Sequence, residues 1–185
     1  MAAYILSGCD TVSYPFRIGK KRAFKTALQC IDDLGQVAAF DENNVSESTV
    51  KFAQNYFFAL YGRKEFNGTL DELRCHLFMS KHGDLRSLPP TSDAFKLHLL
   101  RSLNQLVICR KASEVRPTLP DPSSFGRKIE NGFLVALRMT KARKPSYVGT
   151  SCKCKKGRCR VRCQCKAAGV KCRGDPSLCA LAQPD

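Results

Sequence analysis

The chain has 185 residues, of which 43% are hydrophobic, so it is long enough for one packed domain with a small appended module. No stretch approaches the roughly 20 apolar residues of a membrane-spanning helix, and no basic segment precedes the short apolar start, so we expect neither a membrane partner nor a signal peptide. The net charge of +15 favours a partner that is a polyanion.

Helical signals begin at the amino terminus. The first 30 residues predict a helix, an irregular loop over residues 12–19 and a second helix over residues 20–30. The periodic apolar positions of that second helix predict one buried face, formed by Ala23, Phe24, Ala27 and Leu28.

Two further helices have clear start signals. Ser46 or Ser48 suits the N-cap of a helix that runs to Tyr61 and stops at Gly62. Thr69 and Glu72 form a capping box for a short helix that runs to about residue 81. The inner face of the first of these helices should carry Val50, Phe52, Ala53, Phe57 and Leu60.

The longest helix should follow the Pro-Pro-Thr-Ser-Asp segment at residues 89–93 and end near residue 112. Its spacing allows two descriptions of the buried stripe. The first consists of Leu99, Leu103, Leu106 and Cys109, and the other passes through Leu100 and Val107.

The segment after this helix changes character. Residues 113–126 contain three prolines and predict a linker without helical capacity, and Asn131-Gly132 between short apolar runs is typical of a type I′ β-hairpin. The expected fold is therefore mainly α. It has a helical body over residues 1–113, a linker with a β-hairpin over 114–151, and an irregular cysteine-rich zinc module over 152–179.

Four cysteines are scattered singly through apolar surroundings, at Cys9, Cys30, Cys75 and Cys109, and predict buried free thiols. The other seven lie in one short stretch, where residues two apart rarely form disulfides without strain. A reducing compartment is favoured. We expect a nuclear protein, with the cytoplasm as the alternative.

Residues 6–24, LSGCDTVSYPFRIGKKRAF, contain a candidate phosphate-binding loop. Gly19 would let the backbone approach a phosphate, and the helix start at Lys20, Lys21 and Arg22 would add an anion site. The stretch resembles the helix–loop–helix region of flap-endonuclease-like PIN-fold nucleases, in which Asp10 matches an aspartate that helps hold the catalytic metal pair. Family members supply the other carboxylates from upstream strands, so Asp10 is a vestigial ligand candidate and we expect no catalysis by this chain alone. An ordinary helix-capping loop is the alternative.

The clearest chemical signal lies in residues 152–179. Seven cysteines are spaced C-x-C-x4-C-x3-C-x-C-x6-C-x6-C, and thiolates are the ligands that tetrahedral structural zinc prefers. No histidine lies nearby, and two zinc ions that share one bridging sulfur need seven thiolates. The pattern therefore predicts two zinc ions bound by Cys152, Cys154, Cys159, Cys163, Cys165, Cys172 and Cys179.

The spaces between these cysteines are rich in cations. Residues 126–185 hold 15 Lys and Arg against three acidic residues, whereas residues 1–125 hold 16 against 13. Such a basic appendage favours binding to phosphates, although a solvated basic tail is the simpler interpretation. The predicted nucleic-acid contacts in this region are Lys153, Lys155, Lys156, Arg158, Arg160, Arg162, Lys166, Lys171 and Arg173.

The stretch CKCKKGRCRVRCQCKAAGVKC, residues 152–172, resembles the tesmin-like CXC domain of chromatin and cell-cycle regulators. The resemblance implies contact with the DNA backbone and partly with the minor groove. Family members use nine cysteines for three zinc ions, whereas this chain offers only Cys179 after Cys172, so a third zinc would need a further ligand. Arg162 stands where the family often has a tyrosine that enters the groove, and arginine also enters narrow minor grooves.

Three other interpretations of the cysteines remain open. They are a disulfide knot, a site for another metal such as copper(I), and a degenerate module that folds poorly. The first conflicts with the expected reducing compartment, and the last follows from the missing family cysteines.

Segments of the middle, such as LPPTSDA at residues 88–94, resemble uncharacterised animal proteins that look like products of mobile elements. Those proteins join a PIN domain, a helical segment and a terminal CXC module, so the resemblance implies that this chain is the C-terminal part of a longer polypeptide. The sequence as a whole favours a zinc-dependent, non-catalytic DNA-binding protein. The alternatives are a remnant or part of a metal-dependent structure-specific nuclease and a protein–protein interaction module.

Overall fold

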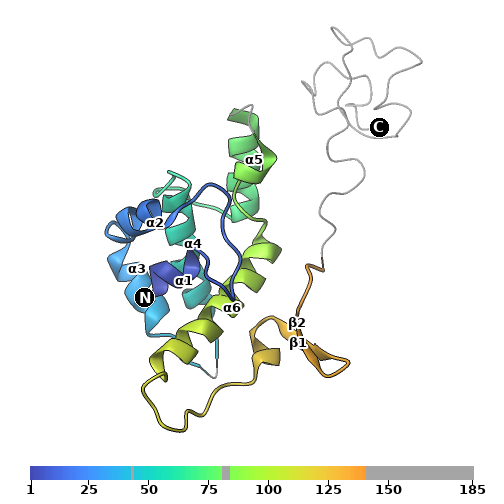
Figure 1. Ribbon diagram of the computed structural model, residues 1–185. Helices are drawn as coiled ribbons and strands as arrows, with labels where there is room; N and C mark the ends of the chain where they lie inside the picture. The colour runs from blue at the N-terminus through green and yellow to red at the C-terminus, as the bar shows by residue number, and fades with distance from the viewer. Residues whose placement is uncertain (43, 81–83, 141–185) are drawn as a thin grey trace, which may run out of the picture. The chain divides into compact units, whose positions relative to one another are not determined.

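Helices dominate the part of the chain that the computed structural model describes, which is residues 1–42, 44–80 and 84–140. These residues belong to one unit, Met1–Thr140, which carries six α-helices and a two-stranded antiparallel sheet (Figure 1). The prediction of a mainly α fold with a small hairpin is confirmed for this unit. The predicted zinc module at 152–179 lies outside the described residues.

The amino-terminal helix–loop–helix is confirmed, with α1 at Ala2–Leu6 and α2 at Lys20–Ala27. However, α2 ends earlier than predicted, and a further helix that was not predicted, α3, follows at Ile31–Ala38. The break occurs at a turn in which the backbone N–H of Cys30 donates to the carbonyl of Ala27, 3.1 Å away. Cys30 then becomes the N-cap of α3 without a side-chain bond.

The predicted buried face of α2 is wrong at its two large residues. Phe24 is 49% exposed and Leu28 is 77% exposed, whereas Ala23 and Thr26 are buried. The cause is close packing, because the hydroxyl of Tyr56 on α4 donates to the carbonyl of Ala23 at 3.1 Å. Only a small side chain fits at such a helix contact, so the bulky residues of α2 turn to the outside.

Helix α4, Glu47–Leu60, begins and ends as predicted. The backbone N–H of Thr49 donates to Ser46 Oγ at 3.2 Å, and Gly62 follows the helix with φ +73°. Ala53, Phe57 and Leu60 are buried as predicted, whereas Val50 and Phe52 are only partly buried. Tyr56 and Phe58 are buried as well, because α4 contacts α2, α3, α5 and α6 and therefore has neighbours on most of its sides.

Helix α5, Leu70–Ser80, starts with the predicted capping box. The N–H of Thr69 donates to Glu72 Oε2 at 2.7 Å, and the N–H of Glu72 donates to Thr69 Oγ1 at 3.2 Å. A 3-10 turn, η1, at Leu85–Ser87 leads to the long helix α6 at Ser92–Arg110, whose N-cap is Thr91.

The buried stripe of α6 combines the two predicted descriptions. Leu99, Leu103 and Leu106 of the first are buried, and Val107 of the second is also fully buried. Cys109 and Leu100 are only partly buried.

In the part of the chain that the structure describes, no helix is long and apolar enough to cross a membrane.

The proline-containing segment does form a helical turn, contrary to the prediction of a linker without helical capacity. A 3-10 turn, η2, spans Pro122–Phe125, because Asp121 Oδ1 accepts from the N–H of Ser123 and Pro122 fixes the first backbone angle. Phe125 is only 2% exposed and joins the hydrophobic core, and η2 contacts α6.

The type I′ hairpin is confirmed. Strand β1, Arg127–Glu130, pairs with β2, Phe133–Ala136, and the turn residues Asn131 and Gly132 both have positive φ, at +52° and +80°. Asn-Gly supplies these two angles at low cost, which explains why the local sequence alone specifies the register.

The four scattered cysteines are free thiols, but their predicted burial is wrong in part. Cys30 is buried, Cys9 and Cys109 are partly buried, and Cys75 on α5 is exposed. Cysteine is often buried because it behaves as a small hydrophobe, yet the register of α5 turns position 75 to solvent.

A buried histidine connects α6 to α1 and to the loop that follows α1. His98 on α6 lies 5.5 Å from the ring centre of Phe57, donates from Nε2 to the carbonyl of Leu6 at 2.9 Å, and accepts at Nδ1 from Ser13 Oγ at 3.0 Å. The neutral ring is thus fully bonded. Burial lowers the pKa of His98 to about 4.

This burial predicts an acid-sensitive fold. Between pH 6.5 and about 4, the unfolded imidazole binds a proton that the folded one does not, so acid favours unfolding in that window. We expect the free energy of unfolding to fall by about 1.4 kcal/mol for each unit by which the pH decreases in this window, because the unfolded His98 gains a proton. His98→Gln should flatten that part of the curve in denaturant unfolding, and parallel curves for the two proteins would contradict the prediction.

Candidate nucleic-acid interface

The predicted phosphate loop, from Gly19 to Arg22, forms the first turn of α2. Gly19 is its N-cap, with φ −82° and ψ 165°, and no side chain bonds the first amides. A Cβ at this position would meet no atom within 4 Å, so the space around Gly19 is open. Because the first amides of a helix have no acceptor inside it, this turn can receive an anion.

Lys20, however, bonds back into the body. Its Nζ donates to the carbonyl of Tyr4 (2.6 Å), to Ser7 Oγ (3.0 Å) and to the carbonyl of Gly8, and it lies 3.8 Å from the centre of the Tyr4 ring. Burial lowers the pKa of Lys20. These three bonds occupy all three ammonium donors, so in this arrangement Lys20 stabilises the end of α1.

The other two predicted cations of this turn differ from each other. The side chain of Lys21 is exposed and forms no hydrogen bond or ion pair with the described residues. Arg22 donates from Nη2 to the carbonyl of Leu60 at 2.6 Å, which caps the end of α4. The turn therefore offers one free cation in Lys21 and one partly engaged cation in Arg22.

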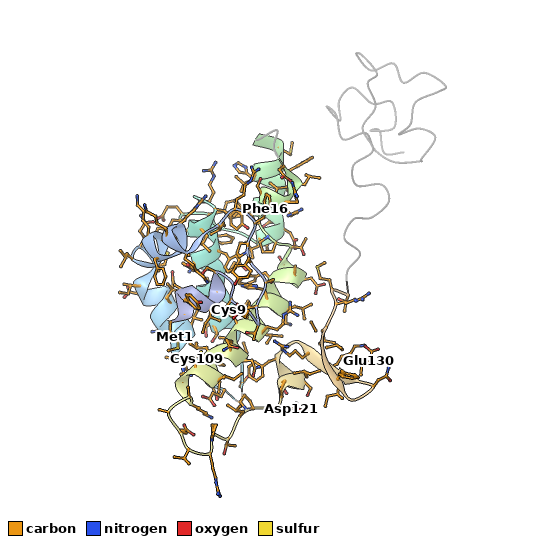
Figure 2. The ribbon with its side chains drawn as sticks, viewed as in Figure 1. Met1, Cys9, Phe16, Cys109, Asp121 and Glu130 are labelled. Atoms are coloured by element: carbon orange, nitrogen blue, oxygen red, sulfur yellow. The ribbon has the colours of Figure 1, made fainter. Side chains whose placement is uncertain are left out.

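A groove of about 260 Å³ opens beside this turn, and Phe16, which is labelled in Figure 2, is one of its lining residues. One wall comes from the loop before α2 and the other from α5 and the segment that leads to α6. Its lining combines guanidinium groups with aromatic and aliphatic side chains: Phe16, Arg17, Ile18, Arg22, Tyr61, Leu77, Phe78, Asp84, Ser87 and Leu88.

The charges around the groove do not balance. Arg86, stacked 4.7 Å from the ring centre of Phe16, is paired with Asp84 at 2.8 Å (Nη2 to Oδ2), and hydrogen bonds from Arg86 lower the pKa of Asp84. Neither Arg17 nor Arg22 forms an ion pair with a carboxylate among the described residues. The groove is therefore positive.

Arg17 has an unusual backbone conformation. Its φ is +60°, in the left-handed region, which costs roughly 1 kcal/mol for a residue with a side chain. The side chain lies 5.2 Å from the ring centre of Phe16. A strained residue that contributes a cation to a groove is a candidate for a binding role.

Asp10 stands apart from other possible metal ligands. It is exposed, in a tight turn whose flanking residues Cys9 and Val12 pair as an isolated bridge. Within residues 1–42, 44–80 and 84–140, no three His, Cys, Asp or Glu side chains gather to form a metal site. The described residues thus bring no carboxylate cluster to Asp10.

The remaining predicted site residues lie outside the described residues. They are the seven cysteines from Cys152 to Cys179 and the nine cations from Lys153 to Arg173. Sequence reasoning missed the groove, although Phe16 and Arg17 follow Pro15 directly in a loop. Tyr61 and residues within 77–88 form the opposite wall, and no local sequence pattern relates those segments to the loop.

Comparison with known proteins adds no family or function to these observations. No protein-family model, no curated protein and no solved structure matches the chain.

The placement of Lys20 leads to a test of its role. Lys20→Met should lower the free energy of unfolding by about 1–3 kcal/mol, because the carbonyls of Tyr4 and Gly8 lose a charged donor. The exposed neighbour provides the control, and Lys21→Met should change stability by less than about 0.5 kcal/mol. Denaturant unfolding measures both. A stable Lys20→Met variant with weakened duplex binding would show instead that Lys20 contacts phosphate.

Proposed function

We propose that the chain is a zinc-dependent DNA-binding protein that performs no catalysis by itself. The observation that carries the proposal is the stretch from Cys152 to Cys179, in which seven cysteines alternate with nine lysine and arginine residues. Thiolates at this spacing suit tetrahedral zinc, and the cations between them suit a phosphate backbone.

Charge supports two zinc ions in this stretch. Seven thiolates with two zinc ions carry a net charge of −3, which the nine neighbouring cations outweigh. The surplus of six positive charges remains available for phosphates. A segment this short has little apolar material for a core, so metal binding would supply most of its folding free energy.

The helical unit supports the same proposal with a second positive surface. The groove beside α2 carries Arg17 and Arg22 without carboxylate partners among the described residues, and Lys21 is exposed at the open helix start. Contacts of this kind bind phosphates without reading bases, so affinity should be largely independent of sequence and strongly dependent on salt.

Metal content and duplex binding test the proposal together. Native mass spectrometry of the full chain should find two zinc ions. Chelation should lower duplex affinity by about tenfold or more, because the released segment must be ordered again at roughly 1 kcal/mol per residue.

A matched pair of variants separates ligand cysteines from ordinary ones. Cys163→Ser should lose zinc and duplex affinity, whereas Cys75→Ser, at an exposed free thiol of α5, should keep both. A chain that contains no zinc, or that binds duplex equally well after chelation, would overturn the proposal. Magnesium-dependent cleavage that Asp10→Ala abolishes would point to a nuclease, and duplex binding that does not respond to salt would favour a protein partner.

The groove can be tested through Arg17. Arg17→Asn removes the cation while keeping a residue that tolerates a left-handed backbone, so stability should change by less than about 0.5 kcal/mol. The slope of log affinity against log salt concentration should decrease by about one, as expected for one lost phosphate contact. Arg17→Lys retains the charge and should retain the slope. An unchanged slope in Arg17→Asn would remove the groove from the interface.

A further inference from the structure

Two arginines lie where the hairpin adjoins the helices. Arg101, in the middle of α6, donates from Nη1 to the carbonyls of Gly126 (3.3 Å) and Leu137 (3.5 Å). Arg127, the first residue of β1, donates from Nη2 to the carbonyl of Thr11 at 3.2 Å. Arg101 thus contacts the residue that directly precedes Arg127, and the charge of Arg127 contributes to lowering the pKa of Arg101, so the two side chains are electrostatic neighbours.

The pair has no counter-charge in the described part of the chain. The ion pairs there involve Arg86, Arg110, Lys111 and Lys128, and neither arginine of this pair takes part in one. The pKa of Arg101 is lowered, first by burial and then by the positive charge of Arg127. Two positive charges therefore lie in a partly buried region, where backbone carbonyl groups accept their hydrogen bonds.

One donor of this pair has no acceptor at all. The Nε of Arg127 is buried and has no hydrogen-bond partner among the described residues. A buried donor without an acceptor costs roughly 1–3 kcal/mol, which native proteins usually avoid. Fastening the hairpin explains the carbonyl bonds of Arg101 and Arg127, but it explains neither the adjacent like charges nor the unpaired Nε.

A bound anion would balance the two positive charges and supply acceptors for the guanidinium donors that the carbonyl groups leave free. A phosphate carries negative charge and several acceptor oxygens, and guanidinium groups bind it through two parallel hydrogen bonds. The fixed planar fork of each arginine and the free donors of the pair match such a group. Both side chains are only partly buried, so a phosphate can reach their outer nitrogen atoms from solvent, whereas the Nε of Arg127 itself is closed to solvent.

We propose that Arg101 and Arg127 together bind one backbone phosphate of a nucleic-acid strand. This inference rests on the proposed DNA-binding function and adds a site to it at the hairpin. The chain continues from β2 through Arg138 into the cation-rich residues 141–173, so the pair belongs to a run of positive charge along the sequence.

The test compares charge-removing and charge-keeping variants of the full zinc-loaded chain. The double variant Arg101→Gln with Arg127→Gln should reduce the salt slope of duplex binding by one to two, about one for each lost phosphate contact. The double lysine variant loses the same planar forks but keeps both charges, so it should keep the slope with weaker affinity. Lys51→Gln, at an exposed cation of α4, is the control and should change neither.

A second measurement does not depend on the fold of a variant. The Nε–H resonance of Arg127 in the unmodified chain should shift on addition of duplex DNA, and inorganic phosphate serves as the simplest probe of the site. A shift with duplex, together with the reduced slope, supports the inference. A shift with inorganic phosphate alone indicates an adventitious ion only and overturns it, as does a slope that the glutamine variant leaves unchanged. If the unmodified chain binds no duplex under any condition, the proposed function itself fails.

Discussion

The helical unit depends on how the end of α1 is held. The last carbonyl groups of so short a helix find no N–H donor inside it, and two side chains from distant segments supply donors there. Lys20 donates to the carbonyls of Tyr4 and Gly8, and His98 donates to that of Leu6. These bonds connect α1 with α2 and α6 and fix both ends of the loop between them. The position of Arg17, and with it the groove, follows from this anchoring.

The same anchoring distinguishes engaged from exposed cations at the start of α2. A run of Lys20, Lys21 and Arg22 suggests one uniform basic patch in the sequence, but the three side chains have different surroundings. Lys20 is fully engaged inside, Arg22 caps α4, and Lys21 is exposed. The phosphate binding that we propose for this region would therefore rest on the open helix start and on Arg17 rather than on the whole run.

Local chemistry made several elements predictable, and tertiary packing decided the rest. Ser46, the Thr69 and Glu72 pair, and Asn131-Gly132 act within a few residues, so their helix starts and hairpin were predicted correctly. Helix α3 was missed because its N-cap, Cys30, makes no side-chain bond, although Asp32 and Asp33 in its first turn were an available signal. Contacts between distant segments determine the exposure of Phe24 and Leu28, the groove and the arginine pair. No local sequence pattern encodes such contacts.

The hairpin is stabilised by its contacts with neighbouring segments. Two strands of four residues are marginally stable in water by themselves, and here Phe125, Arg101 and Arg127 tie them to α6 and to the loop after α1. Opening of this ribbon breaks few apolar contacts, so it should occur well below the free energy of global unfolding. Each such opening would release Arg127 from its carbonyl and separate it from Arg101. An anion held by the two arginines, as we propose, would favour the docked ribbon, because it would offset the repulsion between their charges.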